Sequence, residues 1–210
     1  KSSLMWAIQG ATKSSGKVLV NHDGSWADPR KADAATARRM VSLVPQSASD
    51  LLYLPTVAEE CAQADKESEV PDGTTRDILS RLGVELPEDR NPRDMSEGQR
   101  LALVLAIQLS SRPDILLLDE PTRGVDVGSI EFQHDRIIAE RDAGTPVLIV
   151  STELDEVLEL ADRIAVMYRG RIIGVVDAVG EGAEAGVGGE PDAGRCLVGD
   201  DGAEQLGLAE

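Results

Sequence analysis

The segment RDMSEGQRLALVLAIQLSSRPDILLLDEPTRGVD, residues 93–126, holds the strongest structural signals of the chain. Within it, residues 115–118 are a short run of branched apolar residues that ends at two carboxylates, Asp119 and Glu120. A run of this length without polar alternation is typical of a strand buried on both faces of a parallel sheet. Open α/β sheets place their chemistry at the carboxyl ends of strands, so the acidic pair marks a candidate site.

The first half of the same segment predicts a buried helix. A polar turn, residues 96–99, precedes a run that is apolar almost all round from Leu101 to Leu109 and stops before Pro113. A helix that is apolar on every side must be buried, and proline disfavours the helical conformation in the residue before it.

Three motifs in this segment resemble those of the ATP-binding cassette (ABC) ATPases. S-E-G-Q-R at residues 96–100 resembles the signature loop, usually L-S-G-G-Q, with Glu97 replacing the first glycine and Met95 replacing the leucine. I-L-L-L-D-E-P-T at residues 115–122 resembles the Walker B strand with its catalytic glutamate, and G-V-D at residues 124–126 resembles the D-loop. Either of the first two motifs alone is equally compatible with a capped core helix and a solvated strand end; together, at this spacing, they favour the family.

Composition limits the other possibilities. The 210 residues allow one domain with an elaboration or two small lobes, and with 2% aromatic residues the core must be aliphatic. A net charge of -17 argues against nucleic acid as a partner, because neutralising phosphates needs clustered Lys and Arg. Cys61 and Cys196 lack metal-ligand spacing and fit a reducing compartment. No apolar run has the roughly 18 to 20 residues of a membrane span, so any membrane role would pass through a spanning partner.

Strands alternate with helices along the chain, which predicts a parallel sheet with right-handed crossovers. We expect strands at residues 17–20, 41–44, 115–118, 147–151, 164–168 and 171–176. We expect helices at residues 1–9, 35–40, 57–64, 74–82, 98–110, 129–141 and 154–160, the first of them closed by Gly10. His134 falls in the middle of a helix and is expected at the surface.

With the resemblance, these elements imply an α/β fold of the P-loop NTPase (RecA-like) type, in its ABC ATPase form. Residues 1–45 and 113–176 would form the parallel-sheet core, and residues 46–112 an inserted helical subdomain that carries the Q-loop and the signature loop. Residues 177–210 are rich in Gly, Ala and acid with few branched apolar residues, so we expect a flexible acidic tail.

The resemblance also implies that the chain binds ATP and Mg²⁺. Lys1 and Ser2 resemble the end of a phosphate-binding loop, G-x-x-x-x-G-K-S, cut just before its lysine, although a bare K-S also suits an ordinary first helix. Lys1 would reach the β- and γ-phosphates, Ser2 would bind Mg²⁺, and Ser3 would lie beside the nucleotide. Because the sequence lacks the glycines of that loop, it predicts poor ATP binding.

Other positions take roles from the same resemblance. Gln46 matches the Q-loop glutamine, which contacts Mg²⁺ or the attacking water; the alternative is a polar turn residue. Asp119 would hold Mg²⁺, directly or through water, and Glu120 would polarise the attacking water. Ser96, Gly98, Gln99 and Asp126 would serve the nucleotide of a second cassette, so that two subunits enclose two ATP molecules head to tail.

One expected residue is absent. The family's switch histidine usually follows the strand after the D-loop as T-H-D, and here the sequence is V-S-T-E at residues 150–153. Thr152 therefore takes the catalytic position, and its hydroxyl cannot supply the charge-assisted contact of a histidine to the γ-phosphate. We expect a site that binds ATP better than it hydrolyses it.

Two branches of the family are represented. Residues 50–61 and the signature region resemble the ATPases of energy-coupling factor importers, whereas the sequence from Thr122 onward resembles the second cassette of sugar and nucleoside importers. The halves can be a natural fusion or a recombinant join. The implied function is the ATP-hydrolysing subunit of an ABC importer, peripheral at the cytoplasmic face of the membrane and partnered by a second cassette and by transmembrane permease subunits. The alternatives are a catalytically silent regulatory cassette and a soluble ABC protein of DNA repair or translation.

Overall fold

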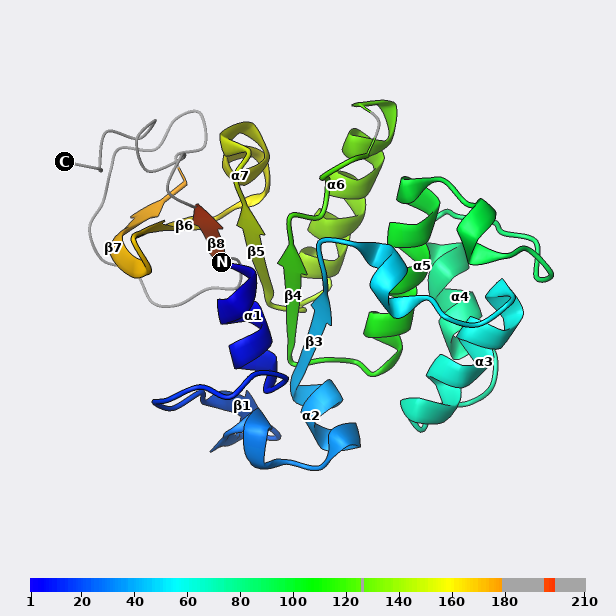
Figure 1. Cartoon of the computed structure of the whole chain (residues 1–210), viewed down its shortest axis with the longest axis horizontal. Helices are drawn as coiled ribbons and strands as arrows, with labels where there is room; N and C mark the ends of the chain where they lie inside the picture. Colours follow the sequence, from blue (N-terminus) through cyan, green and yellow to red (C-terminus); the bar gives the residue numbers. More distant parts are fainter. Residues whose placement is uncertain (126, 179–194, 199–210) are drawn as a thin grey trace.

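A six-stranded sheet forms the centre of the computed structural model, which describes residues 1–125, 127–178 and 195–198 (Figure 1). Its strand order is β3-β4-β5-β8-β6-β7, and each neighbouring pair is parallel except β6 and β7. The strands are β3 (Val41–Val44), β4 (Ile115–Asp119), β5 (Val147–Ser151), β6 (Arg163–Tyr168), β7 (Arg171–Asp177) and β8 (Arg195–Val198). The expected α/β fold with a parallel sheet is confirmed.

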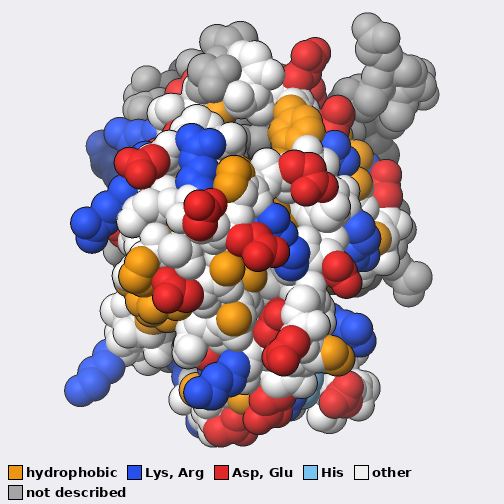
Figure 2. Space-filling model, turned by 90° about the vertical axis from the view of Figure 1, so that its right-hand side faces the viewer, with side chains coloured by type: hydrophobic (Ala, Val, Ile, Leu, Met, Phe, Trp, Pro, Cys, Tyr) orange, Lys and Arg blue, Asp and Glu red, His pale blue; other side chains and the backbone are white. Residues whose placement is uncertain are grey.

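The helices are α1 (Ser2–Gln9), α2 (Ala34–Met40), α3 (Val57–Glu67), α4 (Thr74–Arg81), α5 (Glu97–Ser110), α6 (Val127–Asp142) and α7 (Leu154–Leu160), with single 3₁₀ turns at Pro29–Lys31, Ala48–Leu51 and Pro92–Asp94. In Figure 1, α3, α4 and α5 lie together beside β3. Figure 2 shows the outer surface of that side, where acidic and basic side chains are interspersed. Gly10 ends α1 in the left-handed conformation, as expected.

The first strand lies later than expected. β1 (Val20–His22) and β2 (Ser25–Ala27) form an antiparallel hairpin outside the main sheet. Asp23 and Gly24 make the turn with φ of 49° and 77°, a conformation that Asp-Gly adopts readily and that fixes the strand boundaries. The predicted strand at residues 17–20 is therefore wrong in position.

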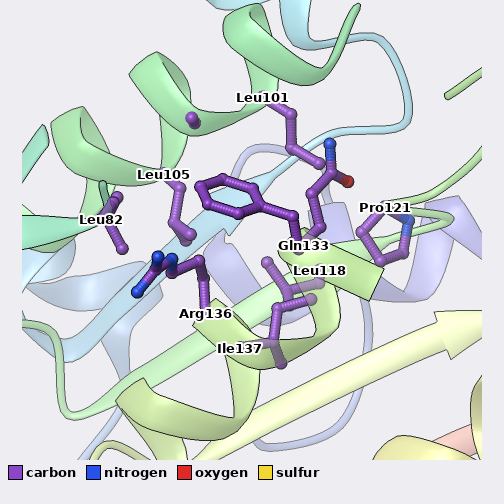
Figure 3. Close-up of a pocket in the computed structure, with 10 residues that line it drawn as sticks. Leu82, Leu101, Leu105, Leu118, Pro121, Gln133, Arg136 and Ile137 are labelled. Carbon is purple, nitrogen blue, oxygen red and sulfur yellow. The ribbon is translucent and has the colours of Figure 1, made fainter. Parts of the chain in front are cut away.

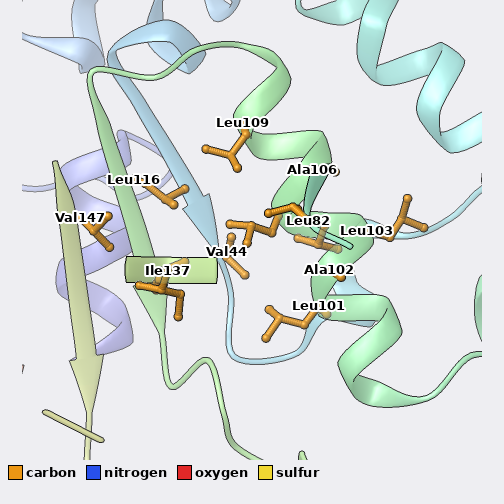
Figure 4. Close-up of a cluster of buried hydrophobic side chains, with 14 of the residues drawn as sticks. Val44, Leu82, Leu101, Ala102, Leu103, Ala106, Leu109, Leu116, Ile137 and Val147 are labelled. Atoms are coloured by element: carbon orange, nitrogen blue, oxygen red, sulfur yellow. The ribbon is translucent and has the colours of Figure 1, made fainter. Parts of the chain in front are cut away.

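The core is aliphatic and divides over the two faces of the sheet. Leu116 and Leu118 of β4 pack into the cluster that includes the apolar residues of α5 (Figure 4). Leu117 points to the other face and packs with Met5 of α1 and Met40 of α2. The prediction of a buried α5 is confirmed, since its apolar residues from Leu101 to Ala106 are at most 7% exposed.

Two expectations need correction. His134 is only 4% exposed rather than at the surface, because α7 covers it: Nε2 lies 3.6 Å from Oε1 of Glu156, and Nδ1 lies 3.1 Å from Oε2 of Glu159. Within the expected flexible tail, Arg195–Val198 forms β8, parallel to both β5 and β6 and joining them. The composition of residues 177–210 as a whole did not indicate this four-residue strand, which pairs with the backbone N–H and C=O groups of two neighbouring strands. No helix in the described part of the chain is long and apolar enough to span a membrane.

Candidate functional site

An open cleft of about 370 Å³ lies where β3 and β4 end. Pro45 and Gln46 follow β3 directly, Asp119 is the last residue of β4, and Ser2 is the first residue of α1. Parallel strands end at the same edge of a sheet, which is how residues far apart in the sequence converge there. The cleft is lined by Ser2, Trp6, Pro45, Gln46, Ser47, Asp50, Glu97, Asp119 and Arg123.

Asp119 is the most deeply buried carboxylate of the cleft, at 1% exposure. Burial raises its pKa, the neighbouring Ser2 hydroxyl acts in the opposite direction, and the charge of Glu120 raises the pKa further. Its Oδ1 has no hydrogen-bond partner. A buried carboxylate oxygen without a partner, next to a hydroxyl, is suited to a hard divalent cation such as Mg²⁺.

Glu120 is held on both of its carboxylate oxygens. Oε2 accepts hydrogen bonds from the amide of Thr152 at 3.1 Å and from its hydroxyl at 2.9 Å. Oε1 lies 3.7 Å from Nζ of Lys1, and that ammonium is buried without a hydrogen-bond partner. Glu120 also has a φ of 51°, an uncommon conformation for a residue other than glycine. Lys1, Glu120 and Thr152 thus form one polar chain beside Asp119.

Gln46 has a partner that sequence patterns did not identify. With its amide oxygen turned toward Arg123, Gln46 accepts hydrogen bonds from Nε at 3.1 Å and from Nη1 at 2.5 Å. Arg123 lies in the T-R-G segment, three residues after Glu120. This position close to the acidic pair was the one feature of the sequence that could have indicated Arg123 as a site residue. Trp6, Asp50 and Glu97 also line the cleft, and no local pattern singles out the first two.

The signature turn is bonded within its own chain. Ser96 and Gln99 form a capping box at the start of α5, in which each side chain bonds the backbone amide of the other residue. Oε2 of Glu97 lies 2.5 Å from Nη1 of Arg100, and Glu97 lines the cleft. A Cβ added to Gly98 would lie 3.1 Å from Nε2 of Gln133 on α6, so this close approach favours glycine.

Two predicted site residues lie elsewhere. Ser3 is exposed on α1 and is absent from the cleft lining. Asp126 lies outside the described residues. The structure thus brings together Lys1, Ser2, Gln46, Asp119, Glu120 and Thr152, and places the signature turn at the rim through Glu97.

A second cavity, between α5 and α6, is too small for a nucleotide (Figure 3). It measures about 20 Å³ and its wall is apolar except for Gln133 and Arg136. Both side-chain polar atoms of Gln133 lack a hydrogen-bond partner. The volume would admit about one water molecule, but the almost wholly apolar wall offers it few hydrogen-bond partners.

No group of three or more His, Cys, Asp or Glu in the described part of the chain is arranged to hold a metal ion alone. A Mg²⁺ ion in the cleft would therefore need oxygen ligands from water and phosphate. This fits the chemistry of Mg²⁺, which typically binds one or two carboxylates together with substrate phosphates.

Comparisons with known proteins agree with this arrangement. Residues 1–123 match the family model described as ABC transporter. The chain is 38% identical over 173 residues to a Streptomyces coelicolor protein named as an ABC transporter ATP-binding protein, which covers 82% of this chain and 30% of that protein. The chain thus spans less than a third of that relative's length.

Two further relatives correspond to the two branches suggested by the sequence. The energy-coupling factor transporter ATP-binding protein EcfA2 of Symbiobacterium thermophilum is 33% identical over 178 residues, covering 82% of this chain and 61% of EcfA2. The guanosine import ATP-binding protein NupO of Bacillus subtilis is 41% identical over 103 residues, covering 49% of this chain and 20% of NupO. Among solved structures, cbiO1 of Clostridium perfringens superposes with a TM-score of 0.72 at 24% identity, over 84% of this chain and 72% of cbiO1.

Proposed function

Because the chain belongs to the ABC transporter family, we propose that it is the ATP-binding and ATP-hydrolysing part of an ABC importer. The observation that carries the proposal is the convergence of Ser2, Gln46 and Asp119 on one cleft, beside the ion pair of Lys1 with Glu120. These residues come from three separate segments of the sequence. Their meeting at one sheet edge supplies the cation, hydroxyl and carboxylates that phosphoryl transfer from ATP to water requires.

Each residue has a chemical task in this proposal. Lys1 and the amino end of α1 would bind the phosphates, because an ammonium and free helix amides both favour anions. Ser2 and Asp119 would hold Mg²⁺, and Gln46 would bind the ion or the attacking water. When bound, the ion neutralises charge on the phosphate oxygens. Glu120 would accept the water proton on a carboxylate that Thr152 keeps in place.

Partners and location are part of the same proposal. Ser96, Gly98, Gln99 and Asp126 would act on the nucleotide of a second cassette, and the pair would drive transmembrane permease subunits from the cytoplasmic face of the membrane. EcfA2 is named for energy-coupling factor transport and NupO for guanosine import. These relatives therefore support an importer without selecting one cargo.

Turnover measurements on two substitutions test the proposal. Glu120→Gln should lower ATP turnover by about 10² to 10⁴-fold while ATP binding is retained, because the general base is lost but not the phosphate contacts. Asp119→Asn should abolish the dependence of ATP binding on Mg²⁺. Asp72→Asn, an exposed acid in the α3–α4 loop, is the matched control and should change neither. Glu120→Gln with wild-type turnover would refute the hydrolytic role.

A catalytically silent cassette is the second candidate. Thr152 favours it, because a threonine occupies the expected histidine position and its hydroxyl is already bonded to Glu120. A silent cassette would bind Mg-ATP, show no turnover above background and lose nothing on substitution of Glu120. Binding and turnover measured on the same preparation separate the two candidates.

A further inference from the structure

Strand β7 is an exposed edge with an unusual sequence. It ends the six-stranded sheet, and among the described residues it pairs only with β6. Its sequence is R-I-I-G-V-V-D, and Ile172, Ile173, Val175 and Val176 are 56%, 43%, 48% and 42% exposed. They are half of the eight large hydrophobic side chains exposed in the described part of the chain. An edge strand presents unpaired backbone amides and carbonyls, which can pair with another strand.

We propose that β7 pairs with β7 of a second copy of this chain, antiparallel and centred on Gly174. In that register Arg171 lies opposite Asp177 of the other copy at both ends. Ile172 then lies opposite Val176, and Ile173 opposite Val175. Apart from its charged ends, every cross-strand pair is made of branched apolar side chains or of the two glycines.

The charges select this arrangement over others. A parallel pairing in register would place Arg171 opposite Arg171 and Asp177 opposite Asp177, and like charges directly opposite each other are unfavourable. A slip by two residues in the antiparallel arrangement loses both opposite-charge pairs. Opposite charges and β-branched pairs across neighbouring strands are both stabilising. The strand is therefore complementary to itself in one register.

The bulge in β7 limits how far such pairing extends. The pairing with β6 shifts register between Val166 and Met167, which leaves Ile173 as the extra residue. A bulge increases the local twist and so disfavours long, flat edge pairing. We therefore expect a short and reversible contact. Gly174 next to the bulge leaves open space, since no atom lies within 4 Å of an added Cβ.

The proposed contact produces a dimer and no larger assembly, and it leaves the cleft free. Antiparallel self-pairing is isologous, so it uses the β7 edge of both copies at once. The cleft lies at the ends of β3 and β4, toward the opposite edge of the sheet (Figure 1). This dimer is therefore distinct from the head-to-tail pairing of cassettes proposed above, and it should form without nucleotide.

Exchanging the charges tests the register. Sedimentation of the whole chain without nucleotide should show a reversible dimer. Arg171→Asp or Asp177→Arg alone should weaken association at least tenfold, and the double variant should restore it, because each cross-strand pair is then rebuilt with reversed charges. Asp177 also lies 3.6 Å from Arg163 of its own chain, so Arg171→Asp is the cleaner single change. Asp72→Arg is the charge control and should leave the association unchanged.

Disulfide formation provides an independent measurement, in a Cys196→Ser background that keeps the buried Cys61. Gly174→Cys should form a cross-linked dimer under mild oxidation, because directly opposed residues have Cα atoms about 4.5 to 5.5 Å apart. Ile172→Cys should not cross-link to itself, because its two copies lie four residues, roughly 14 Å, apart. Ile172→Cys mixed with Val176→Cys should cross-link.

The outcomes are decisive in both directions. Restoration by the double charge exchange and cross-linking at position 174 but not 172 support the proposal. The proposal is overturned if the wild-type chain stays monomeric and Gly174→Cys forms no cross-link, even if β7 binds some other surface. Single charge variants that associate like wild type, or a dimer that needs Mg-ATP, also overturn it.

Discussion

Thr152 binds the carboxylate of Glu120 through two donors at once, its amide at 3.1 Å and its hydroxyl at 2.9 Å, both on the same oxygen. The contact joins the residue after β5 to the residue after β4, two neighbouring parallel strands. It fixes the direction of the other oxygen, which faces Lys1. The threonine at the expected histidine position is thus an orienting contact for Glu120.

Removing that hydroxyl should reduce ATP turnover. Thr152→Val keeps the shape and the amide bond but deletes one hydrogen bond to a charged group, worth about 1.5 to 3 kcal/mol. If the bond persists in the transition state, turnover falls by roughly 10- to 150-fold. Thr152→Ser keeps the hydroxyl and is the control. Equal turnover of the valine and serine variants would contradict the orienting role.

Asp65 should be a large contributor to the stability of the α3–α4 region. This carboxylate is 1% exposed and accepts bonds from the Gly73 amide at 2.7 Å and from the amide and hydroxyl of Thr75 at 2.7 and 2.6 Å. Asp65→Ala leaves these donors without their partner, so we expect a loss of about 2 to 4 kcal/mol in urea unfolding. Asp72→Ala, exposed in the same loop, should stay within about 0.5 kcal/mol of wild type.

Glu60 should make stability depend on pH. Burial raises its pKa above the ordinary value of 4.5, and hydrogen bonds from the Leu54 and Tyr53 amides oppose this only in part. The folded state therefore holds a proton that the unfolded state has released, and the contribution of Glu60 to the free energy of unfolding falls as pH rises above about 4.5.

Glu60→Gln should remove this dependence, because glutamine can still accept the bond from the Leu54 amide but cannot ionise. We expect the variant to gain stability relative to wild type between pH 4 and pH 7 in urea unfolding. Asp72→Asn, exposed in the α3–α4 loop, is the control. A constant difference across this range would show that Glu60 has the same pKa in both states.

Cys61 should be unreactive in the native protein. Burial raises the pKa of its thiol to about 11, so only about one molecule in a thousand carries the thiolate at pH 8. We expect native Cys61 to resist a thiol reagent at pH 8 and to react at once in denaturant. Rapid modification without unfolding would show that the α3 region opens readily.

Much of the fold was predictable because its elements carry strong local patterns. The run at β4 has no polar alternation, and α5 is apolar all round, so both were identified with boundaries within one residue. His134 was placed wrongly because its burial depends on α7, which reaches it only in the folded chain. β8 was missed because four residues in a Gly-rich segment gain their pairing only from strands elsewhere in the sequence.

For the candidate site, residue types were predictable but contacts were not. Motif spacing identified Gln46, Asp119 and Glu120, whereas the bonds of Gln46 to Arg123 and of Glu120 to Thr152 arise from the approach of separate loops. The roles assigned to Ser96, Gly98 and Gln99 toward a second cassette remain predictions.

The position of β8 constrains how the protein is made. A ribosome delivers β5, β6 and β7 before the strand that lies between β5 and β6, so the nascent chain carries two open strand edges until β8 emerges. Exposed edges of this kind invite wrong pairing with other nascent chains. Slow translation after residue 178, or early release of the polypeptide, is therefore the stage at which chaperone assistance would matter most for its yield.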